Sequence, residues 1–100
     1  MHAYLPATLY FQGQANLALN QPEAARHCWQ EARAIAEAIG SRRWLWQILF
    51  ALSRLEPDPA EAKRLRQQAR EIIDYIVDHA PPDFRASFLG LPEVQAVLTA

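Results

Sequence analysis

Apolar residues recur at intervals of three and four along most of the chain, a spacing that places them on one side of an α-helix. Prolines and glycines separate the periodic segments, and no stretch alternates apolar and polar residues as a half-buried strand would. The sequence therefore predicts an all-α fold. The expected helices are four longer ones over residues 6–19, 22–39, 42–55 and 59–79, and two short ones over residues 82–89 and 92–98.

The segment 22–39 carries the strongest helical signal. Pro22 suits the first position of a helix, and Gly40 suits the position just after its last turn. The apolar positions of this segment are Ala25, Cys28, Trp29, Ala32, Ile35, Ala36 and Ile39. They share one face, so we expect that face to be buried.

A repeat becomes visible when the first two segments are compared with the next two. Gly13, Ala25, Trp29 and Ala32 follow one another at separations of 12, 4 and 3 residues. The small and aromatic anchor positions of the tetratricopeptide repeat (TPR) have the same separations, and the chain resembles that family here. The spacing suits two antiparallel helices in close contact, with a residue without bulk where they cross and an aromatic ring beside it.

A second, degenerate copy follows in residues 41–79. When positions are counted back from Ala62, Trp46 and Leu49 occupy the leading tryptophan and leucine positions of the repeat, and Ala69 occupies its last alanine position. This copy departs from the pattern at two positions, because Phe50 replaces the glycine and Arg66 replaces the aromatic residue. The resemblance to the TPR family covers about residues 9–79.

The tail resembles a closing segment found in one bacterial subset of these repeats. Residues 82–94 read PDFRASFLGLPEV, which is similar to segments at the C-terminus of large signalling ATPases, nucleotide cyclases and transcription activators. The resemblance implies a regulatory or partner-binding region that belongs to a longer polypeptide. We expect one domain over residues 1–100, with repeat 1 at about 6–40, repeat 2 at about 41–79 and a helical cap at 81–99.

The composition narrows the possible functions. Ten basic and eleven acidic side chains leave a formal charge of −1, which argues against direct binding of nucleic acid. One cysteine excludes an internal disulfide framework and any multi-cysteine metal site. The longest apolar stretch, residues 44–55, is interrupted by polar residues and is too short to span a bilayer, and the first residues lack the features of a signal peptide. We therefore expect a cytoplasmic protein without a membrane partner.

No arrangement of residues indicates catalysis. The chain contains no glycine-rich phosphate loop, no His-Glu-x-x-His pair and no nucleophile elbow. His27 and Cys28 are neighbours on a helix, where adjacent side chains point about 100° apart and cannot easily chelate one ion together. We expect a protein that is not an enzyme and has neither a metal site nor a cofactor.

The segment 59–79 divides its charges by sign. Lys63, Arg64, Arg66 and Arg70 precede a run of acidic residues, which is made up of Glu71, Asp74 and Asp78. An ordinary solvated helix face accounts for this pattern, and a basic patch for an acidic partner is the alternative.

The resemblance also implies a binding surface. In TPR proteins the first helix of each repeat faces the ligand, and the corresponding residues here are Tyr10, Gln14, Leu17, Trp44, Gln47 and Arg54. Trp44 and Trp46 lie two positions apart and point to nearly opposite sides of one helix, and the repeat places Trp46 in the core. We therefore expect a non-catalytic protein–protein interaction module, which binds a protein or peptide partner or its own upstream domains.

Two alternatives remain open. Two repeats leave the first helix uncovered, so Tyr10 and an apolar edge formed by Leu5, Leu9 and Phe11 would be buried by an upstream repeat or by a second copy of the chain. The chain would then act as a homodimerising structural element. The other alternative is a small-molecule sensor region of a transcription regulator, with a pocket near Trp44 and Tyr10.

Overall fold

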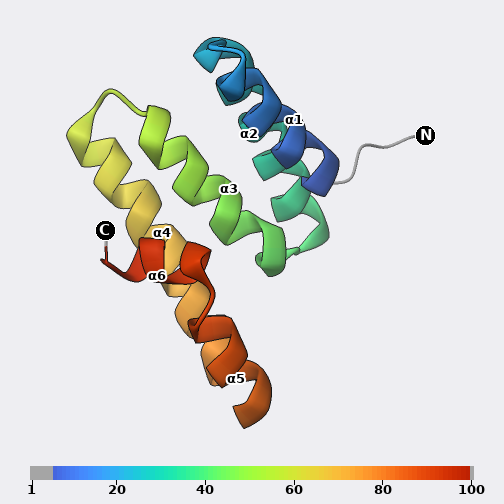
Figure 1. The fold of residues 1–100 in the computed structure, drawn as a ribbon, viewed down its shortest axis with the longest axis vertical. Helices are drawn as coiled ribbons and strands as arrows, with labels where there is room; N and C mark the ends of the chain where they lie inside the picture. Colours follow the sequence, from blue (N-terminus) through green and yellow to red (C-terminus); the bar gives the residue numbers. More distant parts are fainter. Residues whose placement is uncertain (1–5, 100) are drawn as a thin grey trace.

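The computed structural model describes residues 6–99, which form six helices without any strand in that range. They are α1 (Pro6–Ala18), α2 (Pro22–Ile39), α3 (Arg42–Leu55), α4 (Pro59–Asp78), α5 (Pro82–Leu89) and α6 (Pro92–Thr99) (Figure 1). The predicted all-α class is confirmed. Every helix begins and ends within one residue of the position predicted from the sequence.

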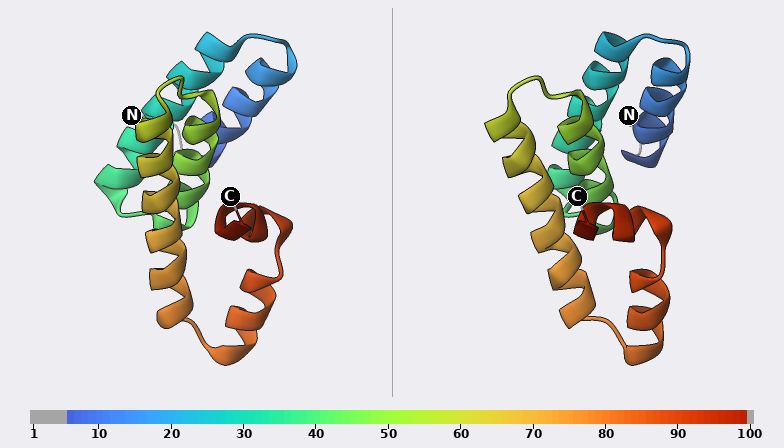
Figure 2. Two further views of the ribbon diagram at one scale, coloured as in Figure 1. Left: turned by 90° about the vertical axis from the view of Figure 1, so that its left-hand side faces the viewer. Right: turned by 60° about the vertical axis from the view of Figure 1, so that its left-hand side comes forward.

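Consecutive helices form two antiparallel hairpins that pack side by side. α1 packs against α2, α3 packs against α4, and α2 joins the hairpins by packing against α3. α1 also contacts α3. In Figure 2, α5 lies beside the C-terminal end of α4, and α6 turns back across the hairpin, where it contacts α4.

The first hairpin depends on a close approach between Gly13 of α1 and Trp29 of α2. A Cβ atom at residue 13 would lie only 2.7 Å from Cδ1 of the Trp29 indole. The indole N–H donates a hydrogen bond to the backbone oxygen of Tyr10, at 3.0 Å. Ala25 and Ala32 of α2 are fully buried. The predicted arrangement of a residue without bulk and an adjacent aromatic ring is confirmed.

A left-handed glycine ends α2. Gly40 has a φ of 70°, and its N–H bonds to the carbonyl oxygens of Ala36 and Glu37. Residues other than glycine rarely adopt this backbone conformation, which lets the chain reverse directly into α3. The predicted end of the helix at this glycine is confirmed.

The core is centred on α3, which is buried on more than one side because α1, α2 and α4 all pack against it. Trp46 is only 3% exposed, as expected, whereas Trp44 is half-buried. The buried apolar residues of α3 are Trp46, Ile48, Leu49, Ala51 and Leu52.

The two terminal helices cover part of the second hairpin. Phe88 of α5 packs edge to face against the Trp46 ring, with the ring centroids 5.9 Å apart. The guanidinium of Arg85 donates hydrogen bonds to the backbone oxygens of Val77 and Ala80 near the end of α4, at 3.1 and 3.2 Å. Arg85 thus connects α5 to the last turn of α4, whose carbonyl groups lack partners inside the helix, and to the residue that follows its C-cap.

Two expectations about exposure were wrong. Leu9 is only 4% exposed, so it cannot belong to an open edge; it lies one turn before Gly13, on the side of α1 that faces α2. Phe11 is 57% exposed, and Leu5 lies outside the described residues. Ile39, expected to be buried, is 62% exposed because α2 ends there and the chain turns away at Gly40.

Candidate functional site

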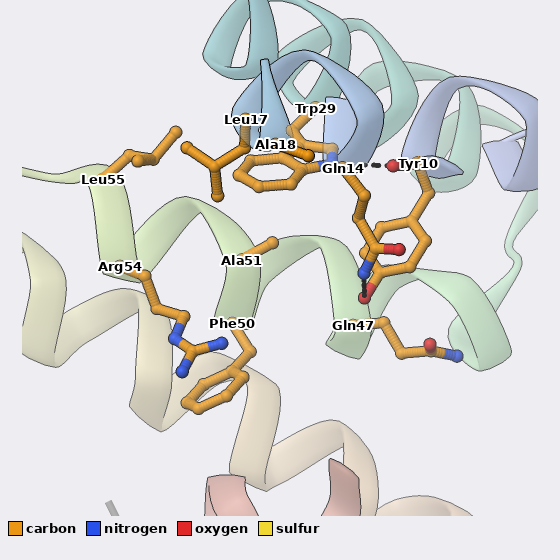
Figure 3. A pocket seen from close by; sticks show the side chains of 10 residues that line it. All are labelled: Tyr10, Gln14, Leu17, Ala18, Trp29, Gln47, Phe50, Ala51, Arg54 and Leu55. Atoms are coloured by element: carbon orange, nitrogen blue, oxygen red, sulfur yellow. Dashed lines mark hydrogen bonds between the residues drawn. The ribbon is translucent and has the colours of Figure 1, made fainter. Parts of the chain in front are cut away.

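A groove of about 410 Å³ lies between α1 and α3, the first helices of the two hairpins. Figure 3 shows side chains from α1 and α3 lining it, together with one residue of α2. The lining residues are Tyr10, Gln14, Leu17, Ala18, Trp29, Gln47, Phe50, Ala51, Arg54 and Leu55.

The packing between α1 and α2 determines where one wall of this groove lies. Trp29 is the single contribution from α2, and its ring is held by the contact with Gly13 and by the hydrogen bond to the Tyr10 backbone oxygen. The side chain of Gln14 donates a hydrogen bond to the Tyr10 hydroxyl oxygen, at 2.9 Å (Figure 3). This bond holds two polar side chains of α1 together on the side of the groove that faces α3.

Aromatic rings gather at the Tyr10 end of the groove. The Tyr10 ring lies 6.3 Å from the Trp29 ring, 5.9 Å from the Trp44 ring and 5.5 Å from the Phe11 ring, measured between centroids. Rings at these separations stabilise one another beyond the effect of their burial alone. Tyr10 is therefore held in a defined, half-buried position.

The structure brings five of the six residues of the predicted binding surface to this groove. They are Tyr10, Gln14, Leu17, Gln47 and Arg54. The sixth, Trp44, does not line it. The Trp44 ring lies beside the groove against Tyr10 and Phe11, and the Arg43 guanidinium sits 5.8 Å from its centroid.

The groove continues toward α6. A second hollow of about 280 Å³ shares five lining residues with the first and adds Trp46 and one edge of α6. The residues that α6 contributes are Pro92, Glu93 and Ala96. We call the two hollows together the central groove.

Glu93 and Phe50 are the main additions to the predicted surface. Nothing local marks Glu93 as a groove residue, because it lies far from α1 and α3 in the sequence and reaches them only through the folding back of α6. Phe50 does have a signal, since it replaces the glycine expected in the second repeat. Its half-buried ring lies under the Arg54 guanidinium, 5.4 Å from Cζ.

The central groove carries charges of opposite sign. Arg54 stands on α3 and Glu93 on α6, and both act on the Tyr10 hydroxyl. Burial of the ring raises the pKa of Tyr10 above its ordinary value, and the negative charge of Glu93 raises it further. The hydrogen bond from Gln14 and the charge of Arg54 act in the opposite direction and are weaker.

This raised pKa predicts a loss of stability at high pH. Unfolded tyrosine ionises near pH 10, whereas Tyr10 in the folded chain keeps its proton to a higher pH. Above about pH 10 the folded chain therefore holds more protons than the unfolded chain, and the free energy of unfolding falls as the pH rises toward the folded pKa. Urea denaturation from about pH 9 to pH 11 should show a smaller decline in Tyr10→Phe than in the wild type. An equal decline of the free energy of unfolding in the two proteins would contradict a raised pKa of Tyr10.

Comparison of the chain with models of known protein families, with curated proteins and with solved structures finds no match. Within residues 6–99, no helix combines the length and the apolar character needed to cross a membrane. The same part of the chain holds no group of three or more His, Cys, Asp or Glu side chains able to bind a metal ion. Cys28 is buried, and its sulfur accepts a hydrogen bond from the Asn16 side chain, at 3.5 Å.

Proposed function

We propose that the chain is a non-catalytic protein-interaction module whose central groove binds an extended segment of a partner protein. The observation that carries the proposal is the composition of the groove, in which aromatic rings, side-chain amides and an exposed arginine face one open hollow. The few residues that dominate the binding energy at protein interfaces are enriched in tyrosine, tryptophan and arginine. A bound segment would place an acidic residue near Arg54 and an apolar residue near Leu17 and Leu55.

A second part of the proposal concerns the architecture of the two helical hairpins. We propose that the two hairpins are TPR-like repeats, supported by the burial of the four small residues that occupy equivalent positions, Ala25, Ala32, Ala62 and Ala69. The second copy differs because its bulky residue, Phe50, stands on the first helix rather than the second. The chain would then be the C-terminal repeat region of a bacterial regulatory or signal-transduction protein. Its partner would be another protein or the upstream domains of the same polypeptide.

A library of random peptides displayed on phage tests the groove directly. We expect selection on the immobilised chain to enrich peptides that bind one site. Arg54→Gln and Gln47→Ala should each weaken the selected peptides by about tenfold or more, as at interface hot spots.

Arg64→Gln is the matched control, because Arg64 lies on α4 and pairs with Glu61 outside the groove. This variant should bind the selected peptides like the wild type. Peptides that bind all three variants equally well, or a selection without enrichment, would contradict the proposal. Circular dichroism of each variant separates a loss of binding from a loss of fold.

A second candidate function, self-association, is favoured by the exposure of Phe11. Its ring is 57% exposed and packs edge to face against the half-buried Trp44, with the centroids 5.8 Å apart. A second copy of the chain would cover this pair of rings. Because Leu9 is buried, the self-associating surface would centre on Phe11 and Trp44 rather than on the edge predicted from the sequence.

A further inference from the structure

The basic side chains of this protein divide into two groups. All ten lie within residues 6–99, and seven of them have a partner there. Two form ion pairs, two donate to backbone oxygens and three lie over aromatic rings. These seven are Arg33 and Arg64, then Arg26 and Arg85, then Arg42, Arg43 and Arg54. Lys63, Arg66 and Arg70 have no such partner among the described residues.

The three remaining cations line one pocket. It has a volume of about 340 Å³, and its lining consists of these three residues with Gln67 of α4 and Val97 of α6. On α4 the cations occupy positions i, i+3 and i+7, which fall on one face of a helix. The pocket shares no lining residue with the central groove.

No acidic side chain of the described chain neutralises this face. Asp74 follows Arg70 by one helical turn, yet its carboxylate forms no ion pair with the Arg70 guanidinium in the described structure, and Glu61 pairs with Arg64 instead. Like charges on adjacent turns repel. The α6 wall makes the cluster concave, and a concave site lined by one sign of charge concentrates its field on a bound ion of the opposite sign.

The spacing of the cations indicates the size of the ligand. Lys63 and Arg70 are seven residues apart, which corresponds to about 10 Å along the helix. A single phosphate or carboxylate group would contact all three cations only if their side chains bent toward it, which costs side-chain freedom. A longer anion can contact each cation along that span. Two guanidinium groups can each bind a phosphate oxygen pair, with the lysine acting as a third point charge. Among the described residues, Val97 is the only apolar one that lines the pocket, and three of the other four are cations.

We propose that Lys63, Arg66 and Arg70 form a binding site for a small linear anion that carries two or more phosphate groups. The site lies on the α4–α6 side of the molecule and is separate from the central groove. Its occupation would remove the repulsion among the three cations and connect α6 to α4 through the bound anion.

Titration of the ¹⁵N-labelled chain with sodium triphosphate, followed by NMR, tests the site. We expect saturable shifts of the Arg66 and Arg70 side-chain Nε–H signals and of the amides around Val97, weakening as the salt concentration rises. Inorganic monophosphate should bind at least about tenfold more weakly, because it contacts fewer of the cations.

Charge-neutralising variants decide whether the pocket, rather than net charge, holds the anion. Arg66→Gln and Arg70→Gln should each lower the affinity for triphosphate by about tenfold. Arg64→Gln removes the same charge from the same helix outside the pocket and should leave the affinity within about twofold of the wild type. Amide spectra report whether each variant remains folded.

Three results would overturn the proposal. The first is the absence of saturable shifts with triphosphate. The second is an equal loss of affinity in Arg64→Gln and Arg66→Gln, which would indicate non-specific attraction. The third is tighter binding of a glutamate-rich peptide than of triphosphate at the same cations, which would make the occupant an acidic protein segment.

Discussion

Replacing Gly13 by alanine is expected to lower the free energy of unfolding by about 2 kcal/mol. The added methyl group would overlap the Trp29 indole, whose position is held by its hydrogen bond to the Tyr10 backbone oxygen. Either α1 moves away from α2 or the indole leaves its place, and both changes disturb the wall of the central groove. The loss should exceed the gain of about 1 kcal/mol that alanine brings to a helix interior. Urea denaturation followed by circular dichroism measures the effect.

Gly90→Ala is the control for this substitution. A Cβ atom at residue 90 would meet only two backbone oxygens, at 3.5 and 3.6 Å, which is ordinary contact. Its φ of −81° suits any residue. We therefore expect a neutral effect or a gain of up to about 1 kcal/mol, because alanine has less freedom in the unfolded chain. Equal effects of the two substitutions would contradict the account of the Gly13–Trp29 contact.

Leu9→Glu is expected to cost at least about 3 kcal/mol and to leave much of the chain unfolded. Leu9 is 4% exposed within the core, so the substitution removes apolar packing and buries a carboxylate without a described partner. Thermal unfolding followed by circular dichroism should show a large decrease in the transition temperature at every protein concentration. A stable variant would indicate that this side chain reaches solvent.

Phe11→Glu serves both as the control for Leu9→Glu and as the test of self-association. Phe11 is 57% exposed, so the variant should lose about 1 kcal/mol or less of stability. If two copies associate through Phe11 and Trp44, light scattering should detect a dimer of the wild type at high concentration and a monomer of the variant. A wild type that remains monomeric, or a variant that still dimerises, would exclude this surface.

The helices could be predicted from the sequence because their signals are local. Proline at the first position of α2 and α4, glycine just after α2 and apolar residues at helical spacing act within a few residues of one another. The contact between Gly13 and Trp29 could be predicted as well, since two helices joined by a short turn have few ways to pack closely. Five residues of the central groove could also be predicted, because the resemblance to the TPR family assigns one face of the first helix of each hairpin to ligand binding.

The remaining features depend on where distant helices lie. The burial of Leu9 was missed although the repeat carries a signal for it. Leu9 lies 37 residues before Trp46, the offset that also separates Ala25 from Ala62, so it occupies the position at which the repeat places Trp46 in the core. Glu93 lines the central groove, and Val97 lines the pocket formed with Lys63, Arg66 and Arg70, only because α6 folds back across the second hairpin.

The charged residues of α4 likewise combine features that the sequence determines with features that depend on the packing of distant helices. The sequence alone determined that four cations precede Glu71, Asp74 and Asp78 on this helix. The pairing of Arg64 with Glu61 is local as well, because the two residues lie three positions apart on one helix. Only the tertiary structure decided that Lys63, Arg66 and Arg70 line a pocket beside α6. Helical periodicity assigns each residue to a face of its own helix, but the partner of that face is set by the packing of segments far apart in the chain.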